Sequence, residues 1–117
     1  SAPPSAIDFC GRTLAVGLSL GKLELFDLDD EESAAPRVLE GHGARITAIH
    51  SFPDGNSFVT ASRDYLLKIW DLESGDSMTT LHGHQKQIFS IAISSDGKTI
   101  ASGGLEGDIH VWRSRRD

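Results

Sequence analysis

Residues 41–71, with the sequence GHGARITAIHSFPDGNSFVTASRDYLLKIWD, decide the fold of this chain. The segment begins with Gly41-His42 and ends with Trp70-Asp71. It recurs 42 positions later, where Gly83-His84 begins a second copy that extends to Trp112. An Asp-Gly turn stands at the same place in both copies. A match without gaps at so many positions indicates two copies of one structural repeat.

A third and weaker copy precedes these two. Phe26-Asp27 stands 44 positions before Trp70-Asp71, and Leu25 matches Ile69. Within the copies, short runs of β-favouring residues are separated by turn residues such as Asp, Gly and Asn. No apolar stripe of helical period runs through any of them. The sequence therefore predicts an all-β chain of about three repeats.

Composition narrows the classes of function. The chain has 117 residues and a net charge of −6, and no apolar run approaches the roughly 18 residues of a membrane-spanning helix. Binding to nucleic acid or lipid headgroups needs clustered basic residues, and the one such cluster, Arg113–Arg116, is expected to be a solvated tail. Cys10 is the only cysteine, which suits a reducing compartment. We expect a protein that acts inside the cell, in the cytoplasm or alternatively the nucleus.

A period of about 40–45 residues between Gly-His and Trp-Asp is typical of one family. The chain resembles WD40-repeat β-propeller proteins over nearly its whole length, with repeat one at 5–40, repeat two at 41–82 and repeat three at 83–117. The resemblance implies about three four-stranded antiparallel blades, an incomplete propeller whose third repeat lacks its outer strand. The implied strands are 5–10, 12–18, 22–27 and 36–40, then 45–51, 57–62, 66–71 and 76–81, then 87–94, 98–103 and 108–113.

The resemblance also implies a polar tetrad in a blade: the histidine of Gly-His, a hydroxyl, an acid in the next turn, and the tryptophan of the third strand. The matching residues are His42, Thr60, Asp64 and Trp70 in repeat two, and His84, Ser102, Glu106 and Trp112 in repeat three. A histidine, a hydroxyl and an acid also make a catalytic triad, but a triad is a single constellation, whereas this set recurs. A structural role is favoured, because these groups can satisfy one another when buried.

Repeats three and one depart from the tetrad pattern. The longer side chain of Glu106 is expected to displace the carboxylate of the third tetrad. In repeat one the tetrad is absent, with Val16 and Leu20 at the hydroxyl and acid positions. We expect repeat one to rest on apolar packing alone, filled by Leu14, Leu23, Leu25 and Phe26.

Metal and cofactor chemistry are not indicated. His82 and His84 alternate in a way that could supply two ligands, but no cysteine or acid has a matching ligand spacing. His82 is expected at the surface, at the end of a strand. The glycine-rich stretch 103–107 lacks the following helix of a phosphate-binding loop. The sequence predicts no metal, no cofactor and no enzymatic activity.

The function implied by the resemblance is that of a scaffold for protein–protein interaction and complex assembly. Partners in this family commonly dock on the loops that flank the tetrad, and the residues expected there are Arg45, Arg63, Tyr65, Gln87 and Leu105. One alternative is a regulatory segment of a larger protein whose catalytic part lies elsewhere. Another is a substrate receptor of a ubiquitin ligase. Such receptors often carry Trp-Asp-x-Arg, which neither 70–73 nor 112–115 matches.

Three blades are too few to close a ring, because propellers have about 4–8. An open arc would leave two apolar blade faces in water. We therefore expect either that the chain is an excerpt of a larger propeller or that partner chains supply the remaining blades.

Overall fold

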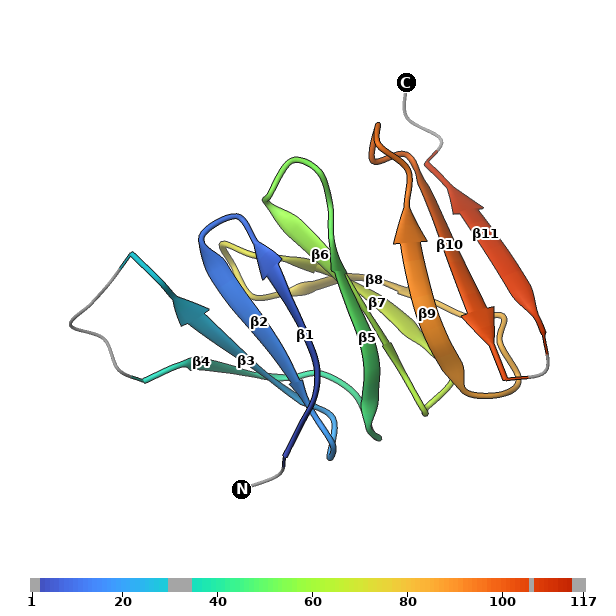
Figure 1. The fold of residues 1–117 in the computed structure, drawn as a ribbon, viewed down its shortest axis with the longest axis horizontal. Helices are drawn as coiled ribbons and strands as arrows, with labels where there is room; N and C mark the ends of the chain where they lie inside the picture. The colour runs from blue at the N-terminus through green and yellow to red at the C-terminus, as the bar shows by residue number, and fades with distance from the viewer. Residues whose placement is uncertain (1–2, 30–34, 106, 115–117) are drawn as a thin grey trace.

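The computed structural model describes residues 3–29, 35–105 and 107–114, and it consists of three antiparallel sheets (Figure 1). The all-β fold predicted from the repeats is confirmed. Among the described residues no helix has the length and apolar character that crossing a bilayer would demand. The strands are β1 (Pro4–Cys10), β2 (Thr13–Leu18), β3 (Lys22–Asp27), β4 (Arg37–Glu40), β5 (Ile46–Ser51), β6 (Ser57–Ser62), β7 (Leu67–Asp71), β8 (Ser77–Leu81), β9 (Ile88–Ile93), β10 (Thr99–Gly104) and β11 (Ile109–Arg113).

Each sheet is a meander of consecutive strands, so each is one blade. Blade one is β1–β4, blade two is β5–β8, and blade three is β9–β11. The first hairpin of every blade turns through a glycine of positive φ, at Gly11, Gly55 and Gly97. Asp54 supports its turn by accepting a hydrogen bond from Asn56 N at 2.9 Å. These turns explain why short extended segments fold back on themselves at such regular spacing.

The first strands of the blades, β1, β5 and β9, pack side by side (Figure 1). Hydroxyl groups join each of these strands to the next. Ser5 Oγ donates to Ile46 O at 2.6 Å, and Thr47 Oγ1 donates to Ile88 O. Phe89 follows Thr47 by the same 42 positions and has no hydroxyl, so blade three cannot repeat this contact.

The hydrophobic core lies between the blades. One cluster joins blade one to blade two and includes Leu23, Leu25, Ile46, Phe58 and Trp70. A second cluster joins blade two to blade three and comprises Val59, Ala61, Leu67, Ile88 and Ile100. Blade two is therefore covered on both faces, which makes it the best buried part of the described chain.

Cys10 belongs to the first cluster and is almost fully buried. Its Sγ lies 3.4 Å from both Gly55 O and Ser57 O, so it donates across the interface between blades one and two. Burial, followed by the charges of Asp54 and Asp8, raises the pKa of the Cys10 thiol to about 11. The thiol therefore stays protonated at neutral pH and is a packing group, not a nucleophile.

The outer faces of blades one and three are open, as an incomplete propeller requires. Ile7 and Phe9 are 62% and 58% exposed on blade one, and Ile109 is 75% exposed on blade three.

The structure corrects one expectation about blade one. Leu23 and Leu25 are buried as predicted, but Leu14 and Phe26 are only half-buried. Leu14 pairs with Phe9 on one side and with Phe26 on the other, so all three share the open face. The expectation that they fill the blade is wrong, because none of the described residues forms a blade that packs on this face.

Candidate functional site

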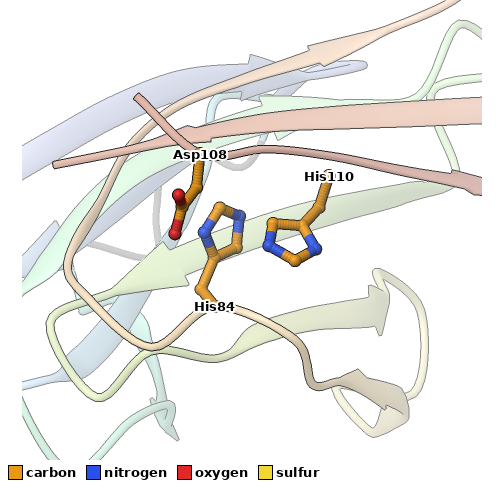
Figure 2. A group of neighbouring side chains, drawn as sticks. All are labelled: His84, Asp108 and His110. Atoms are coloured by element: carbon orange, nitrogen blue, oxygen red, sulfur yellow. The ribbon is translucent and has the colours of Figure 1, made fainter. Parts of the chain in front are cut away.

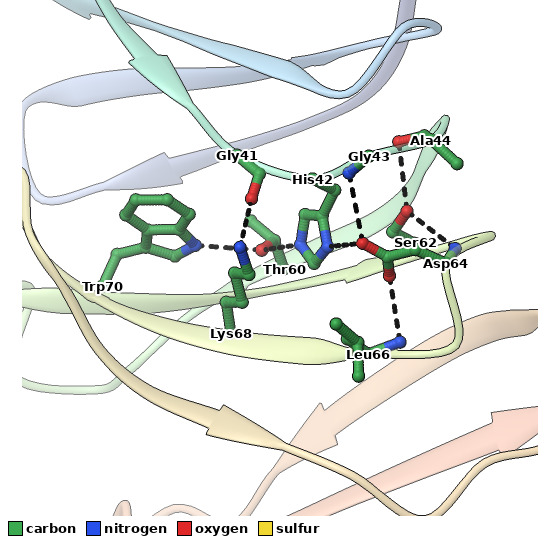
Figure 3. A network of polar contacts seen from close by, with 10 residues as sticks. All are labelled: Gly41, His42, Gly43, Ala44, Thr60, Ser62, Asp64, Leu66, Lys68 and Trp70. Atoms are coloured by element: carbon green, nitrogen blue, oxygen red, sulfur yellow. Dashed lines mark hydrogen bonds and ion pairs between the residues drawn. The ribbon is translucent and has the colours of Figure 1, made fainter.

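Four side chains of blade two form a buried hydrogen-bonded network (Figure 3). His42 Nδ1 lies 2.8 Å from Asp64 Oδ2, and His42 Nε2 lies 2.7 Å from Thr60 Oγ1. Trp70 Nε1 donates to the same Thr60 hydroxyl at 2.9 Å. Because the Asp64 carboxylate can only accept, His42 Nδ1 carries the proton of a neutral imidazole and donates it to Asp64. His42 Nε2 then accepts from the Thr60 hydroxyl.

The network holds the segment before β5 against the turn between β6 and β7. Asp64 Oδ2 also accepts from Gly43 N at 3.3 Å, and Lys68 Nζ donates to Gly41 O at 2.7 Å. Ser62 Oγ donates to Ala44 O at 3.0 Å. Segment 41–44 is therefore tied at several points to strands β6 and β7 (Figure 3).

The geometry of this network favours a structural role over a catalytic one. The side chain of His42 has no exposed surface, so a substrate cannot reach its imidazole. Desolvation by burial lowers the pKa of His42, against the opposing charge of Asp64. The imidazole is therefore neutral at neutral pH and bridges Asp64 to Thr60.

Mild acidification is expected to destabilise the fold. Burial is the main cause that lowers the pKa of both His42 and His84. As pH falls below about 6.5, the unfolded chain binds protons on these groups before the folded chain does, so the free energy of unfolding decreases. Urea unfolding at pH 7.5 and 5.5 measures this. The exposed-site variant His82→Ala should show the same decrease, and a fold equally stable at both pH values would contradict the prediction.

Blade three has a different arrangement at the matching positions. His84 Nε2 lies 2.6 Å from Ser102 Oγ, as the sequence pattern implies. Glu106, the predicted acid, lies outside the described residues. Trp112 forms no hydrogen bond with Ser102 within the described part of the chain; its ring stacks on His110, with centroids 5.6 Å apart. His110 stands 42 positions after Lys68, which is the signal in the sequence that could have drawn attention to it.

In blade one the matching residues form no such site. Val16 is buried and Leu20 is 75% exposed. Neither side chain carries a polar group, so nothing there can orient an imidazole.

The residues predicted to bind partners lie in two equivalent groups at one edge of the blades. Arg63 N donates to Arg45 O at 2.9 Å in blade two, and Leu105 N donates to Gln87 O at 2.9 Å in blade three. Arg45, Arg63 and Leu105 are exposed, whereas Gln87 is half-buried. A backbone hydrogen bond thus joins Arg45 to Arg63 and Gln87 to Leu105. The first pair follows segment 41–44, which the buried network of blade two holds in place.

Tyr65 has an unusual backbone conformation in the same turn. Its φ is 75°, and it is the one non-glycine residue of positive φ in the described chain. The corresponding residues of the other blades are Gly21 and Gly107, with φ of 100° and 80°. A bulky side chain is strained in this region. Since Tyr65 is 44% exposed, burial of its ring does not explain why tyrosine stands there.

Replacing Tyr65 with glycine is expected to raise the free energy of unfolding by up to about 1 kcal/mol. The substitution relieves a left-handed strain of about 1–2 kcal/mol, and the greater freedom of glycine in the unfolded chain offsets part of that gain. Urea unfolding measures the change. Tyr65→Ala is the control, because alanine keeps the strain and should bring no gain. A glycine variant less stable than the parent would show that the ring contributes to the fold.

Known proteins show similarity over most of the chain. The family model of the WD domain, G-beta repeat, matches residues 35–71 and 75–113. The Danio rerio denticleless protein homolog is 32% identical over 103 residues, which cover 87% of this chain and 16% of that protein. Human coronin-7 is 36% identical over 89 residues, covering 75% of this chain and 10% of that protein. The chain therefore spans a small part of these relatives.

Two solved structures of designed proteins have a fold similar to that of this chain. The computationally designed Ika4 protein has a TM-score of 0.84 and 27% identity, and the match covers 97% of this chain and 67% of that one. The designed Ika8 protein has a TM-score of 0.81 and 28% identity, covering 94% of this chain and 33% of that one.

Proposed function

Because this chain belongs to the WD40 repeat family, we propose that it acts as a non-catalytic module for protein–protein interaction. Its recognition edge in blade two comprises Arg45, Arg63 and Tyr65. The strained backbone of Tyr65 is the observation that carries this proposal. A residue kept in a strained conformation on an exposed turn is typical of functional sites. The other two blades have glycine at this position, so the same turn forms there without a side chain.

Rigidity and chemistry at this edge support the same function. The His42–Asp64 contact fixes the segment that leads to Arg45, and Asp64 Oδ1 accepts from Leu66 N at 3.0 Å within the turn that holds Tyr65. Ordered loops on a rigid scaffold bind with little loss of conformational entropy. Arginine and tyrosine are frequent anchors at protein interfaces, and two arginines favour a partner segment that carries carboxylates.

Site-specific photo-crosslinking tests the recognition edge. A photoreactive amino acid at position 65 should give a discrete protein adduct, and Arg45→Ala with Arg63→Ala should reduce its yield. The matched control places the same amino acid at Lys98, an exposed position in a hairpin turn between the first two strands of blade three. An adduct of the same protein from position 98, or no change with the arginine variants, would contradict the proposal.

The open blade faces are part of the proposed working form. We propose that further blades, from the same longer protein or from partner chains, cover Ile7 and Phe9 on one side and Ile109 on the other. Light scattering of the isolated 117-residue chain should therefore show self-association driven by these faces. A well-folded and fully dispersed monomer would contradict this expectation.

A second candidate function is that of a regulatory segment in a longer protein. It is favoured by the small share of the relatives that the chain spans, which is 10% of human coronin-7 and 24% of human WD repeat and SOCS box-containing protein 1. The sequence of the complete protein decides between the two, because it shows whether a catalytic domain lies outside these residues. A ubiquitin-receptor role gains no support from blade two, where Glu73 replaces the arginine of the receptor pattern and its carbonyl accepts from Arg37 Nη1 at 2.9 Å.

A further inference from the structure

Three side chains of types that can ligate a metal converge in blade three (Figure 2). His84, Asp108 and His110 each have a ligand atom within 4.8 Å of the others. His84 is buried, and the other two are half-buried. Within the described residues, His84 Nδ1 is a buried nitrogen without a hydrogen-bond partner. An unpaired buried nitrogen is costly, so this atom points to a missing partner.

The cluster replaces the pattern found in blade two. There Leu66 and Lys68 stand 42 positions before Asp108 and His110, and the Lys68 ammonium is engaged with Gly41 O. In blade three both positions carry side chains that can ligate a metal. The two histidine rings lie close to each other, with centroids 4.1 Å apart. Sequence spacing did not reveal the cluster, because His84 comes from the segment before β9 whereas His110 lies in β11.

Neighbouring groups orient both imidazoles. Ser102 Oγ lies 2.6 Å from His84 Nε2, which leaves His84 Nδ1 for a ligand. Trp112 stacks on the His110 ring at an angle of 20°. Residue 104 is glycine. A side chain at this position would crowd the free nitrogen of His84, because its Cβ would lie 3.0 Å from His84 Nδ1. The contact between Ser102 and His84 Nε2 is typical of metal-binding histidines, in which a neighbouring group holds the ring nitrogen that does not bind the metal.

We propose that blade three binds one divalent transition-metal ion, Zn²⁺ in the first instance, through His84 Nδ1, Asp108 and His110. Two imidazoles and one carboxylate suit Zn²⁺, with bonds of about 2.0–2.2 Å and a fourth position left for water or a partner's side chain. Donor atoms around a tetrahedral ion lie about 3.4 Å apart by the same bond lengths. The half-buried Asp108 and His110 must therefore turn inward from their present separation. The ion would then link the segment before β9 to β11, as the bond from Lys68 to Gly41 O links the corresponding elements of blade two.

Metal titration of the 117-residue chain tests the site. Isothermal titration with Zn²⁺ should give one ion per chain. Co²⁺, used as a spectroscopic probe, should give the visible absorption bands of a four-coordinate ion. The double variant Asp108→Leu and His110→Lys restores the residues of blade two, and it should weaken binding at least about 100-fold. Asp108→Asn keeps the shape of the side chain and should weaken binding about tenfold or more.

Two further variants separate this site from its neighbours. His82→Ala removes the other histidine of the His-Gly-His motif, and Glu106→Gln removes the acid that the repeat pattern would place beside His84. Both should bind Zn²⁺ as the parent does. Circular dichroism checks that every variant keeps its β-sheet spectrum. The proposal is overturned if the folded parent chain binds no Zn²⁺ at micromolar concentration, if the double or Asp108→Asn variant binds as tightly as the parent, or if binding depends on His82 or Glu106.

Discussion

Replacing Trp70 with alanine is expected to lower the free energy of unfolding by about 3–5 kcal/mol. Trp70 is 3% exposed and belongs to the cluster between blades one and two. Its ring stacks on Phe58 with centroids 6.2 Å apart, and its indole donates to Thr60 Oγ1. Alanine would leave a large cavity and remove one hydrogen bond of the buried network. Both effects destabilise the same interface.

Trp70→Phe is the matched control for this prediction. Phenylalanine keeps most of the apolar contact with Phe58 but cannot donate to Thr60, so its cost should be about 1–2 kcal/mol, a smaller cavity together with one lost hydrogen bond. Chemical unfolding followed by circular dichroism measures both variants. Equal losses for alanine and phenylalanine would mean that the hydrogen bond, not the packing, dominates. A loss below about 1 kcal/mol for alanine would contradict the burial of the ring.

Replacing Thr60 with valine is expected to cost about 2–4 kcal/mol. The two side chains have nearly the same shape, so packing changes little. The lost hydroxyl, however, leaves both His42 Nε2 and Trp70 Nε1 without their partner. Each unsatisfied buried group costs about 1–3 kcal/mol. The change should also loosen segment 41–44, because His42 is one of the residues through which that segment is attached.

Thr60→Ser retains the hydroxyl and serves as the control, with an expected loss of about 1 kcal/mol for the missing methyl group. Hydrogen exchange at Gly43 N gives an independent readout, because this amide donates to Asp64 Oδ2. Its protection should fall in the valine variant and persist in the serine variant. Unchanged stability and protection after Thr60→Val would show that the hydroxyl is not the centre of the network.

Much of the architecture could be predicted from the repeats. The ends of the strands lie within one residue of the ranges implied by the resemblance, since alternating apolar residues and Asp-Gly turns are local signals. The residues of the blade-two network could be named as well, because the sequence carries each of them at the position typical of the repeat. Their roles follow from chemistry that the residue types themselves impose.

Two features depend on the assembled structure. Leu14 and Phe26 have the pattern of core residues, and only the absence of a neighbouring blade leaves them half-buried. His84, Asp108 and His110 are separated along the chain and meet because β10 pairs with both β9 and β11.

The sequence by itself thus determined the repeat, the strands and the hydrogen-bonding groups of blade two, for which local propensity and spacing are sufficient. The tertiary structure decided which apolar faces remain open and that three ligand side chains share one site in blade three. Those properties depend on which surfaces and atoms become neighbours in space, and spacing along the chain does not specify that.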